Sequence, residues 1–320
     1  MTRPLHSEPA LLPPCAAVGI RHRSVWPFNL PLALLVLVAS IASSQEPSPG
    51  ATNLEPVQRV QILESVEVTA RREALRKAVD SFVSTVTRAD RANMARWRDP
   101  ICPLVAGAVA AQADFVKSRL EEVANSVRAR VNQDAKCKAN LLLFFTTESD
   151  ELVERVRGRS PGIFSGASRN EIDEFLKSAR PVRVWHSSLL QNADGTDVGR
   201  SSSTATEVRL KDSRITSSVI EEVGSAIVVV DTGRTGNATL GQLADYIAMV
   251  TLAQVDPDAE VADSPTILKL FTEPRPKTFP TQLTDWDYAF LKAVYGMSDS
   301  VVREKRAIAA RMTQDLEHLY

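Results

Sequence analysis

An apolar run near the start of the chain decides which later residues belong to the folded protein. The run, Leu30–Ala42, follows the basic group Arg21–Arg23 and leads through small residues to Gln45. A positive flank, an apolar core of this length and a small-residue end are typical of a secretory signal peptide. A helix that spans a bilayer needs roughly 18 to 20 apolar residues, so the run is short for that purpose. We therefore expect residues 1–44 to be a signal peptide, with an uncleaved membrane anchor at Leu30–Ala42 as the alternative.

Removing this leader changes the counts of cysteine and histidine. The whole chain has three cysteines and four histidines, and without its first 44 residues it keeps Cys102, Cys137, His186 and His318. An even number of cysteines in an exported chain predicts a disulfide bond between Cys102 and Cys137, while two buried thiols are the alternative. Two histidines far apart in the sequence leave little for a histidine-built zinc site, so we expect no metal and no other cofactor.

Charge and composition argue against two broad classes of protein. Lys and Arg number 38 against 39 Asp and Glu, the formal net charge is -1, and 44% of the residues are hydrophobic. A protein that binds nucleic acid normally carries a basic excess, and a disordered chain has fewer apolar residues than this one. We therefore expect a folded protein with no nucleic-acid partner.

The spacing of apolar residues predicts one domain over residues 61–320, preceded by a flexible linker at 45–60 that is rich in Pro, Ser and Gly. Compact apolar runs at Leu141–Phe145 and Ala226–Asp231 predict buried central strands. Alternating patterns predict further strands at Val182–Ser187 and Thr206–Leu210. We interpret this mixture as an α+β fold in which helices pack on a mixed sheet.

Helical spacing separates these strands. In the helix expected from Ala111 to Ala129, the spacing turns Phe115, Leu120 and Val123 towards the core. The other expected helices are 73–86, 149–156, 170–178, 239–252, 283–294 and 298–319.

A short segment at the start of the domain has an alternating pattern of its own. Glu64–Glu73, ESVEVTARRE, alternates apolar and polar residues and includes a basic pair. Adding a strand to a partner's sheet needs only an accessible backbone and alternating side chains. The segment resembles the TonB box of TonB-dependent outer-membrane transporters, and this resemblance implies a strand partner at Val66–Arg72. A plain first strand or the lead-in to the following helix is the alternative.

Three segments in the last third of the chain form an ordered pattern. They are Thr239–Thr251 (TLGQLADYIAMVT), Ser264–Leu268 (SPTIL) and Leu283–Gly296 (LTDWDYAFLKAVYG). Their order resembles the zinc peptidases called metzincins, which have a helix H-E-x-x-H-x-x-G-x-x-H, a turn containing Met, and a helix L-T-x-x-D-x-x-x-L-x-x-L-Y-G. It is also similar to exported bacterial proteins of unknown function. The resemblance implies a zincin-like scaffold, with Leu268 at the position of the turn methionine.

The positions that would carry zinc chemistry hold other residues. Gly241, Asp245 and Thr251 stand where the resemblance places three metal-binding histidines, and Gln242 stands where it places the general-base glutamate. Zinc in such a site needs about three nitrogen or carboxylate ligands and a water molecule, which Asp245 alone cannot supply. The resemblance therefore implies the scaffold without the peptidase.

Three functional classes follow from these observations. The leading expectation is an exported, non-catalytic binding or structural protein of the bacterial cell envelope, periplasmic or secreted, whose partner is a protein or an envelope component. The second is a hydrolase whose site uses acids such as Asp231 and Asp245 without histidine. The third is an accessory factor of a TonB-dependent uptake system, which would use residues 64–73. We favour the first because no motif in the sequence dictates a reaction.

Overall fold

The computed structural model of this protein describes residues 56–87, 94–134, 136–165, 167–192, 197–200, 219–256, 259–261, 264–272, 280–297 and 304–319. The expected signal peptide at 1–44, the alternative anchor at Leu30–Ala42, the first part of the expected linker and the expected strand Thr206–Leu210 lie outside these residues. Within the described ranges, no helix is both long enough and apolar enough to cross a membrane.

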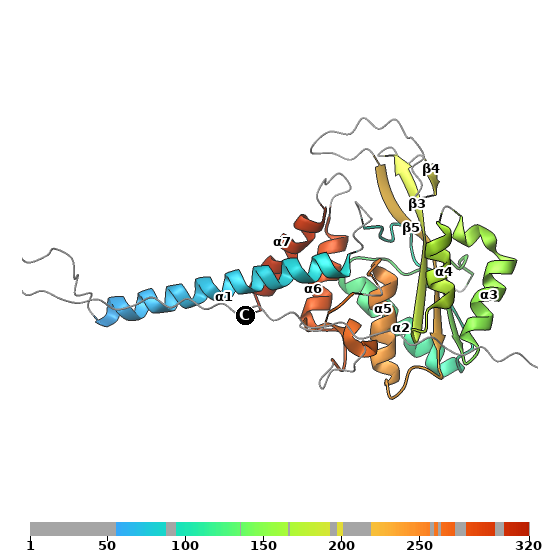
Figure 1. Ribbon diagram of the computed structural model, residues 1–320, viewed down its shortest axis with the longest axis horizontal. Coiled ribbons are helices and arrows are strands. Elements are labelled where there is room, and N and C mark those ends of the chain that lie inside the picture. Colours follow the sequence, from blue (N-terminus) through green and yellow to red (C-terminus); the bar gives the residue numbers. More distant parts are fainter. Residues whose placement is uncertain are drawn as a thin grey trace, which may run out of the picture. The chain divides into compact units, whose positions relative to one another are not determined.

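A mixed sheet organises the described part of the chain (Figure 1). Its strands lie in the order β1-β2-β5-β3-β4, and β1, β2 and β5 are parallel, whereas β3 runs antiparallel to both β5 and β4. This arrangement confirms the expected α+β fold, and the two strands predicted to be central, β2 and β5, are neighbours inside the sheet. The strands are β1 (Pro103–Ala106), β2 (Leu141–Thr146), β3 (Val182–Asn192), β4 (Asp197–Arg200) and β5 (Val219–Asp231).

Helices cover both faces of this sheet. In Figure 1, α3 and α4 lie on one side of it, and α2, α5 and α6 lie on the other. Alternate residues of β5 serve the two sides, because Val228 packs into the core with α2, α5 and α6, while Val229 packs with Phe175 of α4. The helices are α1 (Pro56–Val86), α2 (Ala110–Ser126), α3 (Ser149–Arg159), α4 (Arg169–Lys177), α5 (Leu240–Leu252), α6 (Asp285–Tyr295) and α7 (Glu304–Glu317), with short 3₁₀ helices η1 (Pro161–Phe164) and η2 (Ile267–Phe271).

Helix α1 begins earlier than the sequence pattern indicated. Residues 64–73 are helical, which agrees with the alternative of a lead-in to the following helix and not with an extended segment. Residues 56–60 belong to the same helix and not to a linker. No glycine or proline interrupts residues 57–86, and Glu67 forms an ion pair with Arg71 one helical turn away at 2.7 Å. Such pairs stabilise helices. A partner that added a strand at Val66–Arg72 would first have to unwind α1.

The buried face of α2 differs by one position from the expected face. Val116, Leu120 and Val123 are buried, whereas Phe115, which the spacing turned inward, is 45% exposed. Successive side chains are about 100° apart around a helix, so Phe115 is turned away from the row formed by Val116 and Leu120. The inward positions predicted for Leu120 and Val123 are confirmed, and that predicted for Phe115 is wrong.

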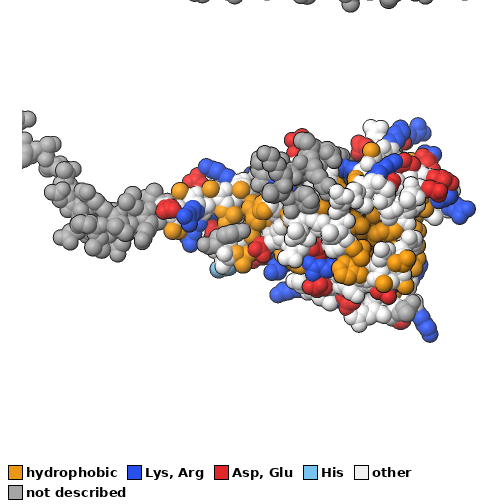
Figure 2. All heavy atoms as spheres, turned by 90° about the horizontal axis from the view of Figure 1, so that it is seen from below, with side chains coloured by type: hydrophobic (Ala, Val, Ile, Leu, Met, Phe, Trp, Pro, Cys, Tyr) orange, Lys and Arg blue, Asp and Glu red, His pale blue; other side chains and the backbone are white. Residues whose placement is uncertain are grey.

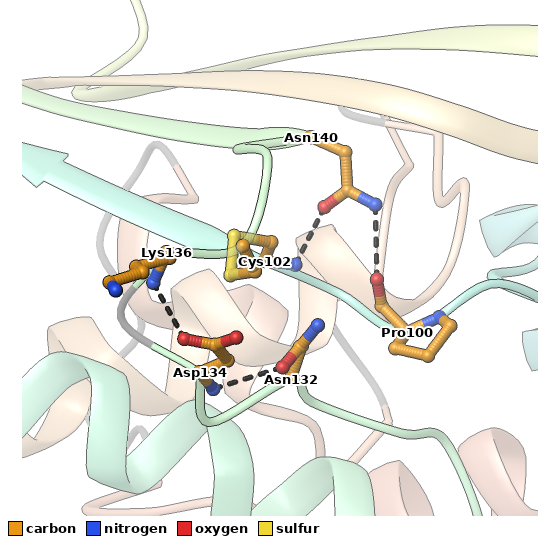
Figure 3. The surroundings of a disulfide bond; sticks show 7 residues. Pro100, Cys102, Asn132, Asp134, Lys136 and Asn140 are labelled. Atoms are coloured by element: carbon orange, nitrogen blue, oxygen red, sulfur yellow. Dashed lines mark hydrogen bonds between the residues drawn. A yellow bond between two sulfur atoms is a disulfide. The ribbon is translucent and has the colours of Figure 1, made fainter.

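A disulfide bond joins Cys102, immediately before β1, to Cys137 in the loop before β2 (Figure 3). The Asn140 side chain supports the same junction, because it accepts a hydrogen bond from the N–H of Cys102 at 2.7 Å and donates one to the carbonyl of Pro100 at 3.1 Å. The predicted pairing of the two cysteines is confirmed. The disulfide bond joins the loop before the inner strand β2 to the start of the outer strand β1.

Candidate functional site

Helix α5 carries the four positions that the resemblance aligned with a zinc motif, and it begins at a capping box. The hydroxyl of Thr239 accepts the N–H of Gln242 at 3.2 Å, and the Gln242 side chain accepts the N–H of Thr239 at 3.0 Å. The amide nitrogen of Gln242 also donates to the carbonyl of Pro280 at 3.1 Å. Gln242, at the position of the general base, is therefore a structural residue whose amide is bonded through both its oxygen and its nitrogen.

Asp245 lies in the core and not in an open cleft. Its side chain is 3% exposed, and that of its partner Arg119, from α2, is 19% exposed. The Nε of Arg119 donates to Oδ1 of Asp245, and the N–H of Leu283 donates to Oδ2 at 2.9 Å. The hydrogen bond from Arg119 to Asp245 raises the pKa of Arg119 above its usual value. A guanidinium group thus neutralises the one carboxylate at the altered zinc positions.

The geometry of α5 keeps the positions of the motif apart. The helix runs from Leu240 to Leu252, so Thr251 lies ten residues, or about 15 Å along the axis, from Gly241. Ala248, at the position of the motif's glycine, lies inside the helix. Zinc ligands lie only about 2 Å from the metal, so Gly241 and Thr251 cannot share one ion. In the ranges that the structure describes, no three His, Cys, Asp or Glu side chains are grouped to hold a metal.

A second buried carboxylate, Asp287 of α6, fastens the turn at 264–268 to that helix. Its Oδ1 accepts the hydroxyl of Thr266 at 2.5 Å, and its Oδ2 accepts the N–H groups of Ile267 and Thr284, each at 2.9 Å. Burial raises the pKa of Asp287 to about 6, against the lowering effect of these hydrogen bonds. The second and third segments of the metzincin-like pattern are therefore joined by the aspartate of the third.

No family model, no curated protein and no solved structure matches this chain.

Asp231, at the end of β5, has partners of its own. It accepts the hydroxyl of Ser149 at 2.5 Å and the N–H groups of Gly233 and Arg234 at 3.0 and 3.2 Å. The Arg234 side chain also lies 3.3 Å from its carboxylate. Asp231 and Asp245, the two acids of the hydrolase hypothesis, thus share no bonded partner, and the structure does not bring them together as a catalytic pair.

A cleft of about 1120 Å³ lies between α4 and α5, beyond the end of β5. It continues along β3 as a narrower cavity of about 120 Å³, because the two hollows share part of their lining. We call the combined feature the β3 groove. The shared lining residues are Glu174, Ser178, Arg180, Tyr246 and Val255.

The narrow part of the β3 groove follows an open edge of the sheet. Among the described residues, β4 pairs with β3 only at Leu189–Gln191, so Val182–Ser188 has a neighbouring strand on the β5 side alone. The N–H of Asp231 donates to the carbonyl of Pro181 at 2.8 Å. In an antiparallel pair, every second residue directs its backbone N–H and C=O towards the partner strand, so this bond shows which residues of β3 bond to β5. The backbone groups of Val182 and Val184 consequently point away from β5.

Apolar side chains flank this edge on both faces. Phe175 of α4 and Trp185 of β3 pack with ring centroids 5.5 Å apart, and Tyr246 and Val250 of α5 line the opposite wall. His186 contacts the carbonyl of Thr251 at 3.2 Å, so its ring helps to attach β3 to α5.

Sequence reasoning predicted β3 but did not single out the groove. The signal was present in the composition of the strand, because Val182–Ser187 lacks the continuous apolar run of the inner strands. An alternating strand of this kind is typical of a position that is not covered on all sides.

Proposed function

We propose that this protein is a non-catalytic binding protein that holds an extended segment of a partner protein in the β3 groove. The observation that carries this proposal is the edge at Val182–Ser188, which no other described strand pairs with and which lies between apolar walls from α4 and α5. An edge strand presents a row of N–H and C=O groups that another extended chain can pair with. Pairing of this kind provides affinity through the main chain, and pockets for alternate side chains provide selectivity.

The dimensions of the edge define the partner segment. Seven residues, Val182–Ser188, span about 23 Å in an extended strand, so a bound segment has a similar length. Side chains of an added strand alternate between the two faces of the sheet. One set would meet Phe175 and Trp185, and the other would meet Tyr246 and Val250, so apolar residues are favoured in the partner.

The contacts of α5 support a role without catalysis. Arg119 neutralises Asp245, Gln242 is held in a capping box, and Thr251 is fully buried in the core. The order of β5, α5, the 264–268 turn and α6, with Asp287 joining the last two, supports a zincin-like scaffold. None of these contacts supplies a nucleophile or an activated water molecule.

Two features support a location outside the cytoplasm. The expected signal peptide would export the chain, and the Cys102–Cys137 bond is of the kind that persists in an oxidising compartment. Both support a role in the periplasm or outside the cell, as a protein of the bacterial envelope.

The proposal is tested by removing one donor from the open edge. Linear peptides would be selected on residues 45–320 from a phage-displayed random library, and their affinity measured by fluorescence anisotropy. Val184→Pro removes the outward N–H and leaves the pairing with β5 intact, since proline is accepted on edge strands. Val184→Thr keeps the N–H and a similar shape, and is the matched control.

We expect V184P to weaken peptide binding by about tenfold, which is the loss of roughly one hydrogen bond, while V184T binds as the wild type does. Circular dichroism would verify that both variants fold. Equal binding to V184P, or a library that yields no binding peptide, would contradict the proposed groove. Mass spectrometry of the peptide after incubation tests the absence of catalysis, because cleaved peptide would show the protein to be a hydrolase.

A further inference from the structure

A separate cleft, away from the β3 groove, collects three positive side chains. It has a volume of about 510 Å³ and is formed where the ends of α2 and α6 meet the outer face of α7. Arg128, Lys292 and Arg311 line it, together with the carboxylate of Asp315. We call it the cationic cleft.

The cations of this cleft have no acidic partner among the residues that the structure describes. Several cations elsewhere on the helices pair with a carboxylate one turn away, as Arg155 does with Glu151 at 2.9 Å. On the face drawn in Figure 2, positive and negative side chains are interspersed. In the cationic cleft, three positive side chains line one hollow together with one carboxylate, and within the described residues none of the three forms an ion pair.

Arg128 occupies a backbone conformation that favours glycine. Its φ is 67°, and it is the one non-glycine residue with positive φ in the described ranges. Its N–H donates to the carbonyl of Asn125 at 3.2 Å, and the N–H of Ala129 donates to that of Ala124 at 2.9 Å. This pair of bonds is a Schellman motif, whose left-handed residue is usually glycine. The Cβ of an L-residue is strained there.

Helix capping accounts for two of the three cations. Lys292 lies in the last turn of α6, and Arg311 donates through Nη1 to the carbonyl of Gly296 at the end of that helix. Positive groups are favourable near helix C-termini. Arg128 also lies at a helix C-terminus, that of α2, but glycine at its position would make the same backbone hydrogen bonds without strain. The presence of an arginine therefore points to a use for its side chain.

We propose that the cationic cleft binds a phosphate group, held between Arg128, Arg311 and Lys292. A guanidinium group presents parallel N–H donors that match two oxygens of a phosphate, and a lysine adds a compact charge. Arg311 donates one hydrogen bond, from Nη1, to the carbonyl of Gly296, and its other N–H groups can bind the ligand. Three cations against the one carboxylate of Asp315 leave an excess of two positive charges, which matches a phosphate dianion.

Substituting Arg128 separates the cost of its backbone conformation from the benefit of its side chain. Arg128→Gly should stabilise the ligand-free protein and raise its Tm by about 2–4 °C, because glycine adopts this backbone conformation without strain. The same substitution should weaken binding of inorganic phosphate by tenfold or more. Arg159→Ala, at the exposed end of α3, removes an equal charge outside the cleft and is the matched control.

The measurements are thermal unfolding in a low-salt buffer without phosphate, and calorimetric titration with inorganic phosphate. Phosphate binding by the wild type and R159A, together with a higher Tm and lost binding in R128G, would support the proposal. Unchanged phosphate affinity in R128G, or no phosphate binding by the wild type, would overturn it. A lower Tm for R128G in the absence of phosphate would also overturn it, because the strain argument would fail.

A second arm distinguishes two sources of the phosphate group. The wild type would be sedimented with phosphatidylcholine vesicles that contain phosphatidic acid, and with vesicles of phosphatidylcholine alone. Sedimentation with the first kind only, lost in R128G, would support a lipid headgroup as the ligand. Binding of inorganic phosphate without sedimentation would support a soluble phosphorylated ligand.

Discussion

The ion pair between Arg119 and Asp245 gives the sharpest test of how the altered zinc positions are built. Arg119→Met keeps the length of the side chain and removes its charge. The Asp245 carboxylate, 3% exposed, would then keep one hydrogen bond, from the N–H of Leu283 at 2.9 Å. A buried carboxylate without a cation is costly, because the protein interior solvates a charge poorly. We therefore expect R119M to destabilise the fold strongly.

The exposure of each partner sets the magnitude of the effect. Breaking a buried ion pair by removing one member costs about 3–5 kcal/mol, and the 19% exposure of Arg119 places R119M near the lower end, at about 3 kcal/mol. Asp245→Asn keeps an acceptor for Leu283, and it leaves Arg119 with Glu122 at 2.7 Å, so we expect a cost of about 2 kcal/mol. The double variant leaves no buried charge, and its cost should be smaller than the sum by about 2 kcal/mol.

The assay is unfolding in urea followed by tryptophan fluorescence, because Trp97 and Trp286 are buried in the core that contains this ion pair. The exposed pair of Glu151 and Arg155 is the control, and its coupling free energy should stay below about 1 kcal/mol. Additive costs for R119M and D245N would show that the two side chains are not coupled. A cost below about 1 kcal/mol for R119M would show that Asp245 does not depend on the guanidinium.

Two further predictions concern the disulfide bond and Asp287. Replacing Cys102 and Cys137 by alanine should lower the free energy of unfolding by about 4 kcal/mol in the same assay, since the bond closes a loop of 35 residues; an unchanged free energy would contradict this. Asp287 has a pKa of about 6 in the folded protein, above its ordinary value of 3.8, so its ionised form opposes folding and stability should rise as the pH falls from 7 towards 4. Measured against Asp287→Asn, which does not titrate, this rise should amount to about 2–3 kcal/mol, and identical pH profiles for the two proteins would refute it.

Local patterns in the sequence predicted those elements of the fold that depend on neighbouring residues or on burial of both faces. The runs at Leu141–Phe145 and Ala226–Asp231 are apolar on both faces, and such runs are stable mainly inside a covered sheet. Helical spacing predicted a helix over residues 283–294, and the structure places a capping box at Thr284, where this helix begins. These elements could be predicted because each depends on neighbouring residues or on burial alone.

Features that depend on distant residues could not be predicted in this way. Arg119 and Asp245 are 126 positions apart, and nothing near either residue identifies the other as its partner. Alternation over Glu64–Glu73 indicated a strand, but the helix favoured by the following residues extends through it, supported by pairs such as Glu67 with Arg71. The β3 groove depends on which residues of β3 the described part of β4 pairs with, which is a property of the register and not of either strand.

The two buried carboxylates, Asp245 and Asp287, are each stabilised by groups of this chain. Asp287 is stabilised by hydrogen-bond donors alone, and those donors hold the 264–268 turn against α6. Asp245 is stabilised by a cation supplied from α2, so the region already contains its own positive charge. Because α5 continues through Ala248 to Leu252, histidines placed at 241, 245 and 251 would still lie along some 15 Å of helix. A zinc site at these positions would therefore require a shorter helix and the removal of Arg119 in addition to new ligands.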